Sequence, residues 1–237
     1  MTDKFSISVE NLSVAYGNLG VLEDLSFDIK NGEFIAIIGK SGTGKTTLLN
    51  ALAGFIEYQG TIKISDKIGF CFQNHSLFPW FTVAENIGFG LSNVSFSEQN
   101  EIVYGILRKI GMIEHQNKYP NELSGGQMQR VALGRAIAYN PNVLLLDEPF
   151  SSLDIYTRDQ MMDWVLKIIS ELNVTVLMVT HYLDEALVLA DRVFVLKDKK
   201  FSNEMTVPFP KPRNQAMRFT EQFQMSKQQL AMFLNQK

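Results

Sequence analysis

FIAIIGKSGTGKTTLLNALA, residues 34–53, is the stretch of this sequence from which the fold follows. Phe34–Ile38 is apolar throughout, which is typical of a strand that is covered on both faces. The turn at residues 39–46 fits the pattern G-x-x-x-x-G-K-[ST], and Thr46–Ala53 is predicted to be helical. A buried strand, a glycine-rich turn and a helix in this order predict a loop that cradles phosphate groups.

The residue types in this turn match what phosphate binding requires. Glycines let the backbone turn tightly and point several N–H groups inward, and the following helix adds its positive end. Lys45 is expected to reach the β- and γ-phosphates of ATP, and the hydroxyl of Thr46 to bind Mg²⁺. The alternative, a glycine-rich turn with a chance lysine, is disfavoured by the strand and the helix around it. The predicted nucleotide contacts of the loop are Gly39, Ser41, Gly42, Gly44, Lys45, Thr46 and Thr47.

A carboxylate site for the metal is predicted at the end of a second apolar run. Val143–Leu146 is strand-sized, and Asp147 and Glu148 follow it directly. Asp147 is expected to hold Mg²⁺ directly or through water. Glu148 points elsewhere, and we expect it to orient and deprotonate the attacking water. Alone, this run would be an ordinary strand end, and the phosphate loop makes the functional interpretation the better one.

Further apolar runs extend the pattern along the chain. Strands are predicted at Phe5–Val14, Leu25–Ile29, Gly60–Ile64, Ile68–Phe72, Val143–Leu146, Val174–Val179 and Arg192–Leu196. Helices are predicted at Glu98–Ile110, Gly125–Ala138 and Thr157–Leu172. Asn31-Gly32 predicts a hairpin turn between Leu25–Ile29 and Phe34–Ile38. Strands that alternate with helices predict an α/β fold with a mostly parallel sheet, into which residues 77–138 are inserted as a helical segment.

Bulk properties exclude several classes of protein. The chain has 237 residues, 46% of them hydrophobic, a net charge of −3 and one cysteine, Cys71. The acidic balance argues against a nucleic-acid partner. One cysteine excludes an internal disulfide framework, so Cys71 is expected to be a small buried hydrophobe. Met1–Glu10 does not resemble a signal peptide, and no run of about 20 apolar residues occurs, so a membrane role would come through a partner.

The tail at residues 198–237 differs from the rest. Together with Lys197 it holds eight Lys/Arg and three Asp/Glu, a net charge of +5, and three prolines. We expect it to be a solvated, loosely packed appendage to a single domain that spans residues 1–237. Attraction to an anionic membrane surface is the alternative.

Residues 123–130, LSGGQMQR, resemble the signature motif of ABC transporter ATPases, and Ser124 lies 23 residues before Asp147. The resemblance implies a phosphate-loop core with an N-terminal antiparallel β subdomain and an inserted helical subdomain. It also implies a homodimer, in which the start of this helix completes the ATP site of a second copy. A capped helix with a flexible start is the alternative for Ser-Gly-Gly alone. The residues concerned are Ser124, Gly125, Gly126 and Gln127.

The same resemblance assigns roles to two residues near the N-terminal half of the site. Tyr16 stands where the family stacks an aromatic ring on adenine, and a core tyrosine is the alternative. Gln73 follows the predicted strand Ile68–Phe72 and is similar to the glutamine that joins metal and water to the membrane partner. The span from Lys45 to Gln73 is shorter than usual, so part of the antiparallel subdomain is expected to be trimmed.

Two further residues match the family after the Asp-Glu strand. Asp154, in Ser152-Leu153-Asp154, is similar to the loop that crosses the dimer interface. His181 is similar to the histidine that contacts the γ-phosphate, although a single histidine at a strand end is more often structural. Tyr182, directly after it, departs from the acidic residue that is common in the family.

A narrower likeness covers residues 77–86, LFPWFTVAEN, which are similar to a stretch of nitrate, sulfonate and taurine importer subunits. It implies separate integral membrane permease subunits, a solute-binding protein reached through them, and a place on the cytoplasmic face of the cell membrane. Importers of thiamine or other aromatic precursors share much of this pattern and stay an alternative. Pro79, Trp80 and Phe81 are expected to form a docking groove for a permease helix, to pack the helical insertion, or to do both.

Three other functions fit parts of the sequence. An ABC ATPase of DNA repair or translation is disfavoured by the single cassette and the acidic balance. A small-molecule kinase is disfavoured by residues 123–130. An exporter subunit is disfavoured by the absence of a fused membrane domain and by Pro79-Trp80.

Overall fold

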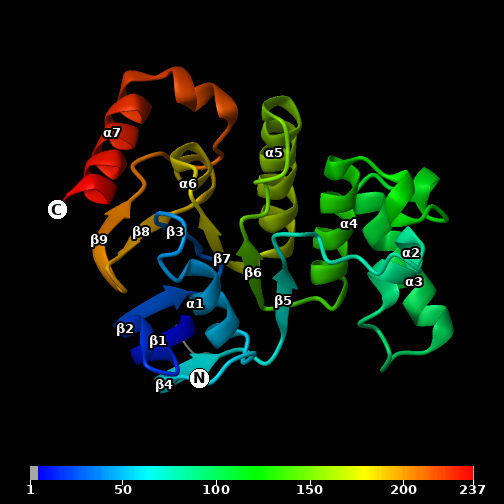
Figure 1. Cartoon of the computed structure of the whole chain (residues 1–237). Helices are drawn as coiled ribbons and strands as arrows, with labels where there is room; N and C mark the ends of the chain where they lie inside the picture. The colour runs from blue at the N-terminus through cyan, green and yellow to red at the C-terminus, as the bar shows by residue number, and fades with distance from the viewer. Residues whose placement is uncertain (1–4, 237) are drawn as a thin grey trace.

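Two β-sheets form the frame of the molecule in the computed structural model, which describes residues 5–236 (Figure 1). The smaller sheet is antiparallel, in the order β2-β1-β4. The larger sheet has the order β5-β6-β7-β3-β8-β9, in which the first five strands run parallel and β9 runs antiparallel to β8. The strands are β1 (Phe5–Tyr16), β2 (Leu19–Lys30), β3 (Phe34–Ile38), β4 (Gln59–Ile64), β5 (Ile68–Cys71), β6 (Val143–Asp147), β7 (Thr175–Thr180), β8 (Arg192–Lys197) and β9 (Lys200–Thr206).

Helices cover both faces of the larger sheet. One helix, α1 (Lys45–Leu52), packs between the two sheets, while the remaining helices lie on the other face or beyond β5 (Figure 1). These are α2 (Val83–Gly88), α3 (Phe96–Lys109), α4 (Gly125–Ala138), α5 (Ile155–Leu172), α6 (Leu183–Leu189) and α7 (Glu221–Asn235), with 3₁₀ turns at Ile113–His115, Pro120–Glu122 and Gln215–Phe219. The predicted α/β fold, with an antiparallel N-terminal sheet and an inserted helical region, is confirmed.

The strand β3 explains why its sequence is apolar at every position. Ile35 and Ile37 pack into the core that α1 shares with the smaller sheet. Ala36 and Ile38 face the opposite core, which α5 and α6 close. All four side chains are fully buried. Because both faces are covered, the strand carries no polar position, as the sequence predicts.

The predicted hairpin at Asn31-Gly32 is wrong. A turn does form there, since the N–H of Glu33 donates to the carbonyl of Lys30 at 3.1 Å. However, β2 pairs with β1 in the smaller sheet, whereas β3 lies between β7 and β8 in the larger one. β3 therefore has both edges occupied and leaves none for β2. Turn residues report only a local reversal of the chain, so the sequence could not tell a hairpin from a change of sheet.

The tail is packed, so the expectation of a loose appendage is also wrong. β9 extends the larger sheet, and α7 packs near α6 and β8. Phe223 and Leu230 of α7 are fully buried, and the ring of Phe223 lies 5.6 Å from that of Phe209. Two or three large apolar side chains are enough to dock a helix, although they are too sparse in the sequence to stand out.

Four positively charged side chains of the tail pair with carboxylates of the core. Lys211 and Arg213 both pair with Asp191, at 2.9 and 3.2 Å. Arg218 pairs with Asp159 at 2.7 Å, and Lys227 with Asp184 at 2.9 Å. These partners lie on α5, on α6 or just after it, so the charges hold the tail against the core. Because these four positive charges are paired within the protein, they do not support the alternative of attraction to an anionic membrane.

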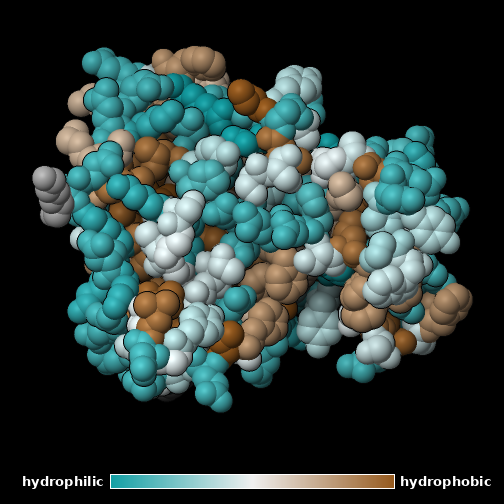
Figure 2. All heavy atoms as spheres, in the orientation of Figure 1, coloured by the Kyte–Doolittle hydropathy of each residue, from teal (hydrophilic) through white to brown (hydrophobic). Residues whose placement is uncertain are grey.

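Two further features of the fold are its surface and its single cysteine. Figure 2 shows one face of the molecule, on which apolar side chains form small groups among polar ones. Within residues 5–236, no helix is both long and apolar enough to cross a membrane. Cys71 is buried, and this burial raises the pKa of its thiol to about 12. It is therefore the small buried hydrophobe that we expected.

Candidate functional site

The carboxyl ends of four parallel strands bring the predicted residues together. In register, Ile38 of β3 lies beside Thr180 of β7, and Val179 of β7 lies beside Asp147 of β6. The loops that leave these strands therefore start at the same edge of the sheet. They carry the phosphate loop, Glu148 and His181, while Gln73 follows β5 beside them. Crevices at this edge are the usual binding sites of open α/β sheets.

The phosphate loop is folded around its own lysine. Lys45 is almost fully buried, and its Nζ donates to the carbonyls of Gly39 and Lys40 at 3.0 and 3.1 Å. Burial lowers the pKa of Lys45, and Glu148 opposes this effect. The glycines are required here: Gly44 has a φ of 99°, and a Cβ on Gly39 would meet the carbonyl oxygen of Leu196 at 2.6 Å.

A hydroxyl and a carboxylate meet beside this loop. The Oγ1 of Thr46 donates to the Oδ1 of Asp147 at 3.1 Å. Asp147 is only 4% exposed, and burial raises its pKa, while the Thr46 hydrogen bond lowers it. Oxygen ligands of this kind are those that Mg²⁺ prefers. In the described part of the chain no group of three or more His, Cys, Asp or Glu side chains could hold a metal ion.

Glu148 contacts Lys45, His181 and Gln73, and these four residues form the Glu148 hub. The Oε1 of Glu148 lies 3.7 Å from the Nζ of Lys45, and its Oε2 lies 3.1 Å from the Nδ1 of His181. Gln73 donates to the same Oε2 at 3.4 Å. The backbone of Glu148 has a φ of 43°, a left-handed conformation that costs about 1–3 kcal/mol in a residue other than glycine. The N–H of Glu148 donates to the carbonyl of Val179 at 3.0 Å and helps to hold that conformation.

The residues at the start of α4 lie apart from this hub. Ser124 accepts from the N–H of Gln127 at 3.3 Å, and the Gln127 side chain accepts from the N–H of Ser124 at 2.9 Å. This reciprocal cap fixes the helix start. Among residues 5–236, no hydrogen bond or ion pair joins residues 124–127 to Lys45 or Glu148. α4 belongs to the helical group near β5, at the end of the sheet away from α1 (Figure 1). Gly125 and Gly126 instead lie against Leu153 and Thr157.

Two other predicted residues lie on open surface. Tyr16 ends β1 and is 53% exposed, so the alternative of a core tyrosine is wrong. Asp154 is exposed and caps α5, since its carboxylate accepts from the N–H of Thr157 at 3.1 Å. The hydrogen bonds from Thr157 lower the pKa of Asp154. Neither side chain contacts Glu148 by a hydrogen bond within the described residues.

The sequence analysis did not predict the role of Glu185 and Arg158, which lie behind His181. Glu185 is 1% exposed and accepts from the hydroxyl of Thr180 at 2.6 Å. Arg158 lies 3.7 Å from it and reaches Tyr182, the neighbour of His181. The signal was present as an acidic residue in the apolar helix LDEALVL, but such a residue usually faces solvent.

Aromatic side chains cluster where α2 begins. The rings of Phe78 and Phe89 lie 4.4 Å apart, and Phe78 also contacts Trp80 and Phe81. The buried side chain of Asn86 holds this loop, since it donates to the carbonyls of Phe78 and Phe81 and accepts from the N–H of Phe78. Trp80 is 67% exposed, whereas Phe78 and Phe81 are half-buried. The cluster therefore packs the helical insertion and also presents an apolar surface.

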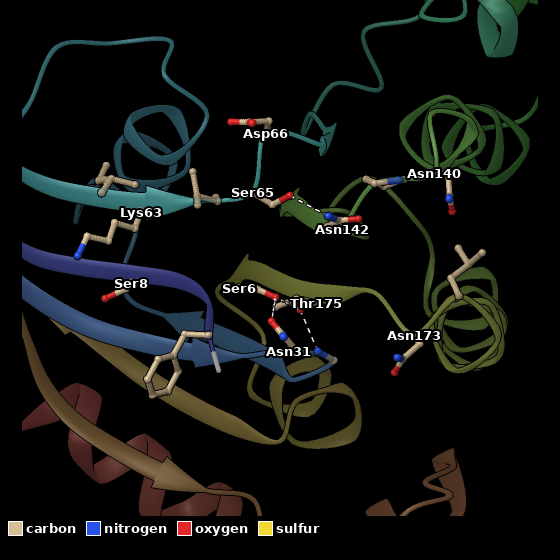
Figure 3. A pocket seen from close by; sticks show the side chains of 16 residues that line it. Ser6, Ser8, Asn31, Lys63, Ser65, Asp66, Asn140, Asn142, Asn173 and Thr175 are labelled. Carbon is tan, nitrogen blue, oxygen red and sulfur yellow. Dashed lines mark hydrogen bonds between the residues drawn. The ribbon is translucent and has the colours of Figure 1, made fainter. Parts of the chain in front are cut away.

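A separate hollow of about 1130 Å³ lies at the opposite ends of the same strands (Figure 3). Asn142 and Thr175, which precede or begin β6 and β7, line it. Thr175 accepts from the N–H of Gly32 at 2.9 Å, and Asn142 donates to Ser65 at 2.9 Å. Hydroxyl and amide side chains line most of it together with Lys63 and Asp66, and none of the predicted nucleotide contacts lines it.

The phosphate loop, the Thr46–Asp147 pair and the Glu148 hub, at the carboxyl edge of a parallel sheet, define a phosphate-loop ATPase. A family model described as ABC transporter matches residues 22–151. The chain belongs to this family of ATP-binding transporter proteins, whose ATP hydrolysis is coupled to transport.

Individual relatives and solved structures agree with this assignment. The chain is 41% identical over 201 residues to the taurine import ATP-binding protein TauB of Escherichia coli (strain K12), which covers 80% of this chain and 79% of that protein. It is 39% identical over 211 residues to the aliphatic sulfonates import ATP-binding protein SsuB 1 of Paracoccus denitrificans, covering 88% and 86%. The bacterial ABC transporter cassette MJ0796, solved as a dimer, superposes with a TM-score of 0.77 at 32% identity over 86% of this chain and all of that one. A second structure of MJ0796, a post-hydrolysis dimer bound to ADP and Pi, gives a TM-score of 0.76.

Proposed function

We propose that this chain is the ATP-hydrolysing motor subunit of an ABC importer for a small anion such as a sulfonate, taurine or nitrate. The observation that carries the hydrolytic part is the Glu148 hub, because one carboxylate there contacts a lysine, a glutamine and a histidine from three separate loops. The class of solute rests on the relatives, which are named for taurine and aliphatic sulfonates.

ATP would be held by the phosphate loop, with its adenine on the exposed ring of Tyr16. The backbone N–H groups of residues 39–47 and the positive end of α1 suit the phosphates. Mg²⁺ would be held by Thr46 and Asp147, with Gln73 as a further ligand, and would neutralise charge on the β- and γ-phosphates. The Thr46–Asp147 pair fits this ion because both groups present oxygen, and phosphate oxygens would complete its coordination.

Glu148 is proposed as the general base. Its carboxylate would accept a proton from the attacking water, while Lys45 and His181 stabilise the charge on the transferring phosphoryl group. Gln73 would orient the same water, because it donates to the Oε2 that would take the proton. His181, which follows β7 on the other side of β6 from Gln73, also contacts this Oε2. The strained backbone of Glu148 supports this role, since such strain gathers at functional sites.

A second copy of the chain would complete the site. Ser124, Gly125, Gly126 and Gln127 form a capped helix start that has no contact with the hub of its own chain, so it is free to face the γ-phosphate of a partner's ATP. Asp154 and the exposed Ile155 and Tyr156 beside it would lie in the same interface. The dimeric structures of MJ0796 support this arrangement.

The permease would dock on the aromatic cluster of Phe78, Trp80, Phe81 and Phe89. The exposed indole of Trp80 offers an anchor for a helix of a membrane subunit. Gln73 lies a few residues upstream and would transmit movement between the ATP site and this docked helix. The solute-binding protein would be reached only through these permease subunits. We therefore propose that the chain acts on the cytoplasmic face of the cell membrane.

Capture from native membranes tests the proposal. The tagged chain should retain a multi-span membrane protein in mild detergent, and Trp80→Ala should weaken that binding by about 30-fold, since a buried aromatic anchor contributes about 2 kcal/mol or more. Phe219→Ala removes a 91% exposed ring elsewhere and should change nothing. If only soluble proteins are retained, the transport assignment is wrong. Growth of a strain lacking this chain on taurine, alkanesulfonate, nitrate or a thiamine precursor then identifies the solute.

A further inference from the structure

Tyr182 lies between the proposed catalytic histidine and an arginine. The centroid of its ring lies 3.9 Å from that of His181, with 38° between the ring planes. The guanidinium carbon of Arg158 lies 4.1 Å from the same ring centroid. The Arg158 distance is within that of a cation over an aromatic face, and the rings of His181 and Tyr182 are in close, tilted contact. The ring of Tyr182 is thus held by Arg158 and contacts the imidazole of His181.

Arg158 is itself fixed by buried groups. It donates to the carbonyl of Leu153 at 3.1 Å, and its Nε lies 3.7 Å from the Oε1 of Glu185. Glu185 is 1% exposed and accepts from the hydroxyl of Thr180 at 2.6 Å. That hydroxyl also accepts from the N–H of Tyr182 at 3.0 Å. The backbone and the ring of Tyr182 are therefore both tied to Glu185, one through Thr180 and the other through Arg158.

His181 needs such support because its side chain is more than a third exposed. Its Nδ1 lies 3.1 Å from Glu148, and this contact alone would leave the imidazole free to turn about that bond. The ring of Tyr182 supplies a second contact on the imidazole. Two contacts from different directions define the orientation of a planar ring, and a histidine that stabilises a reacting group depends on its orientation.

We propose that Tyr182, clamped by Arg158, is a positioning residue that holds the imidazole of His181 against Glu148. The proposal rests on the proposed role of Glu148 and His181 in hydrolysis and extends it to a residue at which this chain departs from its family's acidic side chain. Because Arg158 also holds the carbonyl of Leu153, beside Asp154, the same clamp joins the histidine to the loop that would cross the dimer interface.

Steady-state ATP hydrolysis by the purified full-length chain tests the clamp. Tyr182→Ala should lower kcat about 10- to 100-fold, as expected when a reacting group is misplaced by an ångström or so. The Kd for a non-hydrolysable ATP analogue should stay unchanged, since no hydrogen bond, ion pair or ring contact among residues 5–236 joins Tyr182 to the phosphate loop. Tyr182→Phe keeps the ring and should restore kcat. Tyr104→Ala is the matched control, because Arg108 lies 4.8 Å over its ring on α3, away from the hub.

A double variant separates positioning from other effects. If Tyr182 acts through His181, the variant His181→Ala/Tyr182→Ala should hydrolyse ATP no more slowly than His181→Ala alone. Additive losses, a Phe variant as slow as the Ala variant, or an unchanged kcat in Tyr182→Ala would each overturn the clamp. Should Tyr182→Ala melt early, Arg158→Lys replaces it, because lysine keeps the charge but loses the planar face that stacks on the ring. Unimpaired hydrolysis by both His181→Ala and Glu148→Gln would instead overturn the proposed function.

Discussion

The loops before α1 and α4 both end in a helix start that suits an anion, but their surroundings differ. Lys45, at the start of α1, is buried and lies against Glu148, which His181 and Gln73 also contact. Ser124, before α4, is exposed and is bonded only to the start of its own helix. The first loop lies against Glu148 of the same chain, whereas no hydrogen bond or ion pair among residues 5–236 joins residues 124–127 to Lys45 or Glu148. This difference is why a second copy is proposed to complete the site.

The largest expected effect comes from removing the hub of the first loop. Glu148→Gln keeps the size of the side chain and its contact with His181, but it cannot accept a proton. We expect hydrolysis to fall by about 10²–10⁴-fold while ATP still binds, so that an ATP-bound dimer accumulates. Phosphate release measures the first effect and light scattering on a sizing column measures the second. Rapid hydrolysis by this variant would remove Glu148 as the base.

Mixing two inactive variants sharpens the contrast between the loops. Lys45→Ala disables the phosphate loop, and Ser124→Arg places bulk and positive charge at the start of α4. Each alone should lose at least about 10²-fold in hydrolysis, because each removes transition-state contacts from both sites of a homodimer. A mixed dimer has one site in which both loops are intact.

Partial recovery of hydrolysis on mixing is therefore expected only if the second loop acts across the interface. Differently tagged chains allow the mixed dimer to be isolated before the assay. If mixed dimers form and stay inactive, the start of α4 acts within its own chain, and the comparison between the loops fails. Melting curves of both variants control for the loss of the Ser124 cap, which costs about 1 kcal/mol.

A smaller effect is expected on the free energy of unfolding, through the buried Glu185 behind His181. Burial raises the pKa of Glu185 from its ordinary 4.5 to about 7, although Thr180 and Arg158 favour its charged form. Because the folded-state value is the higher one, its contribution to stability is complete below pH 4.5 and is lost as the pH rises through about 7. This loss is on the order of 3 kcal/mol, since one pKa unit corresponds to about 1.4 kcal/mol.

Urea unfolding at pH 5 and pH 8 measures this contribution. The free energy of unfolding of the parent chain should fall relative to that of Glu185→Gln as the pH rises, because glutamine has no proton to lose. Glu101→Gln, at an exposed position of α3, should follow the parent. An identical pH dependence for Glu185→Gln and the parent would show that Glu185 is already ionised at pH 5.

The chemistry at the first loop could be read from the sequence because function restricts each residue there. Gly39 admits no side chain, Lys45 must reach phosphate, and a carboxylate must end a buried strand. Such requirements act on residues that are close in sequence, so the motif and the elements around it are visible together. Gln73 and His181 are far away in the chain, and only the parallel order of β5, β6 and β7 brings them to Glu148.

Other features depended on contacts that no local pattern reports. Asn31-Gly32 marks a turn, but the pairing of β2 with β1 decides that the chain changes sheet there. The basic tail looks solvated by composition, yet Asp159, Asp184 and Asp191 pair with four of its cations and the core buries Phe223. Arg158 and Tyr182 lie on separate elements, and nothing in their spacing indicates that they touch.

The sequence by itself determined the parallel α/β core, the phosphate loop, the Asp147–Glu148 strand end and the family, because each depends on periodicity or on chemistry within a few neighbouring residues. Only the tertiary structure decided which strands share a sheet, that the tail is docked, and that His181 is supported by Tyr182, Arg158 and Glu185. The physical reason is that burial and charge pairing are set by residues far apart in the chain, whose meeting depends on the packing of the whole sheet.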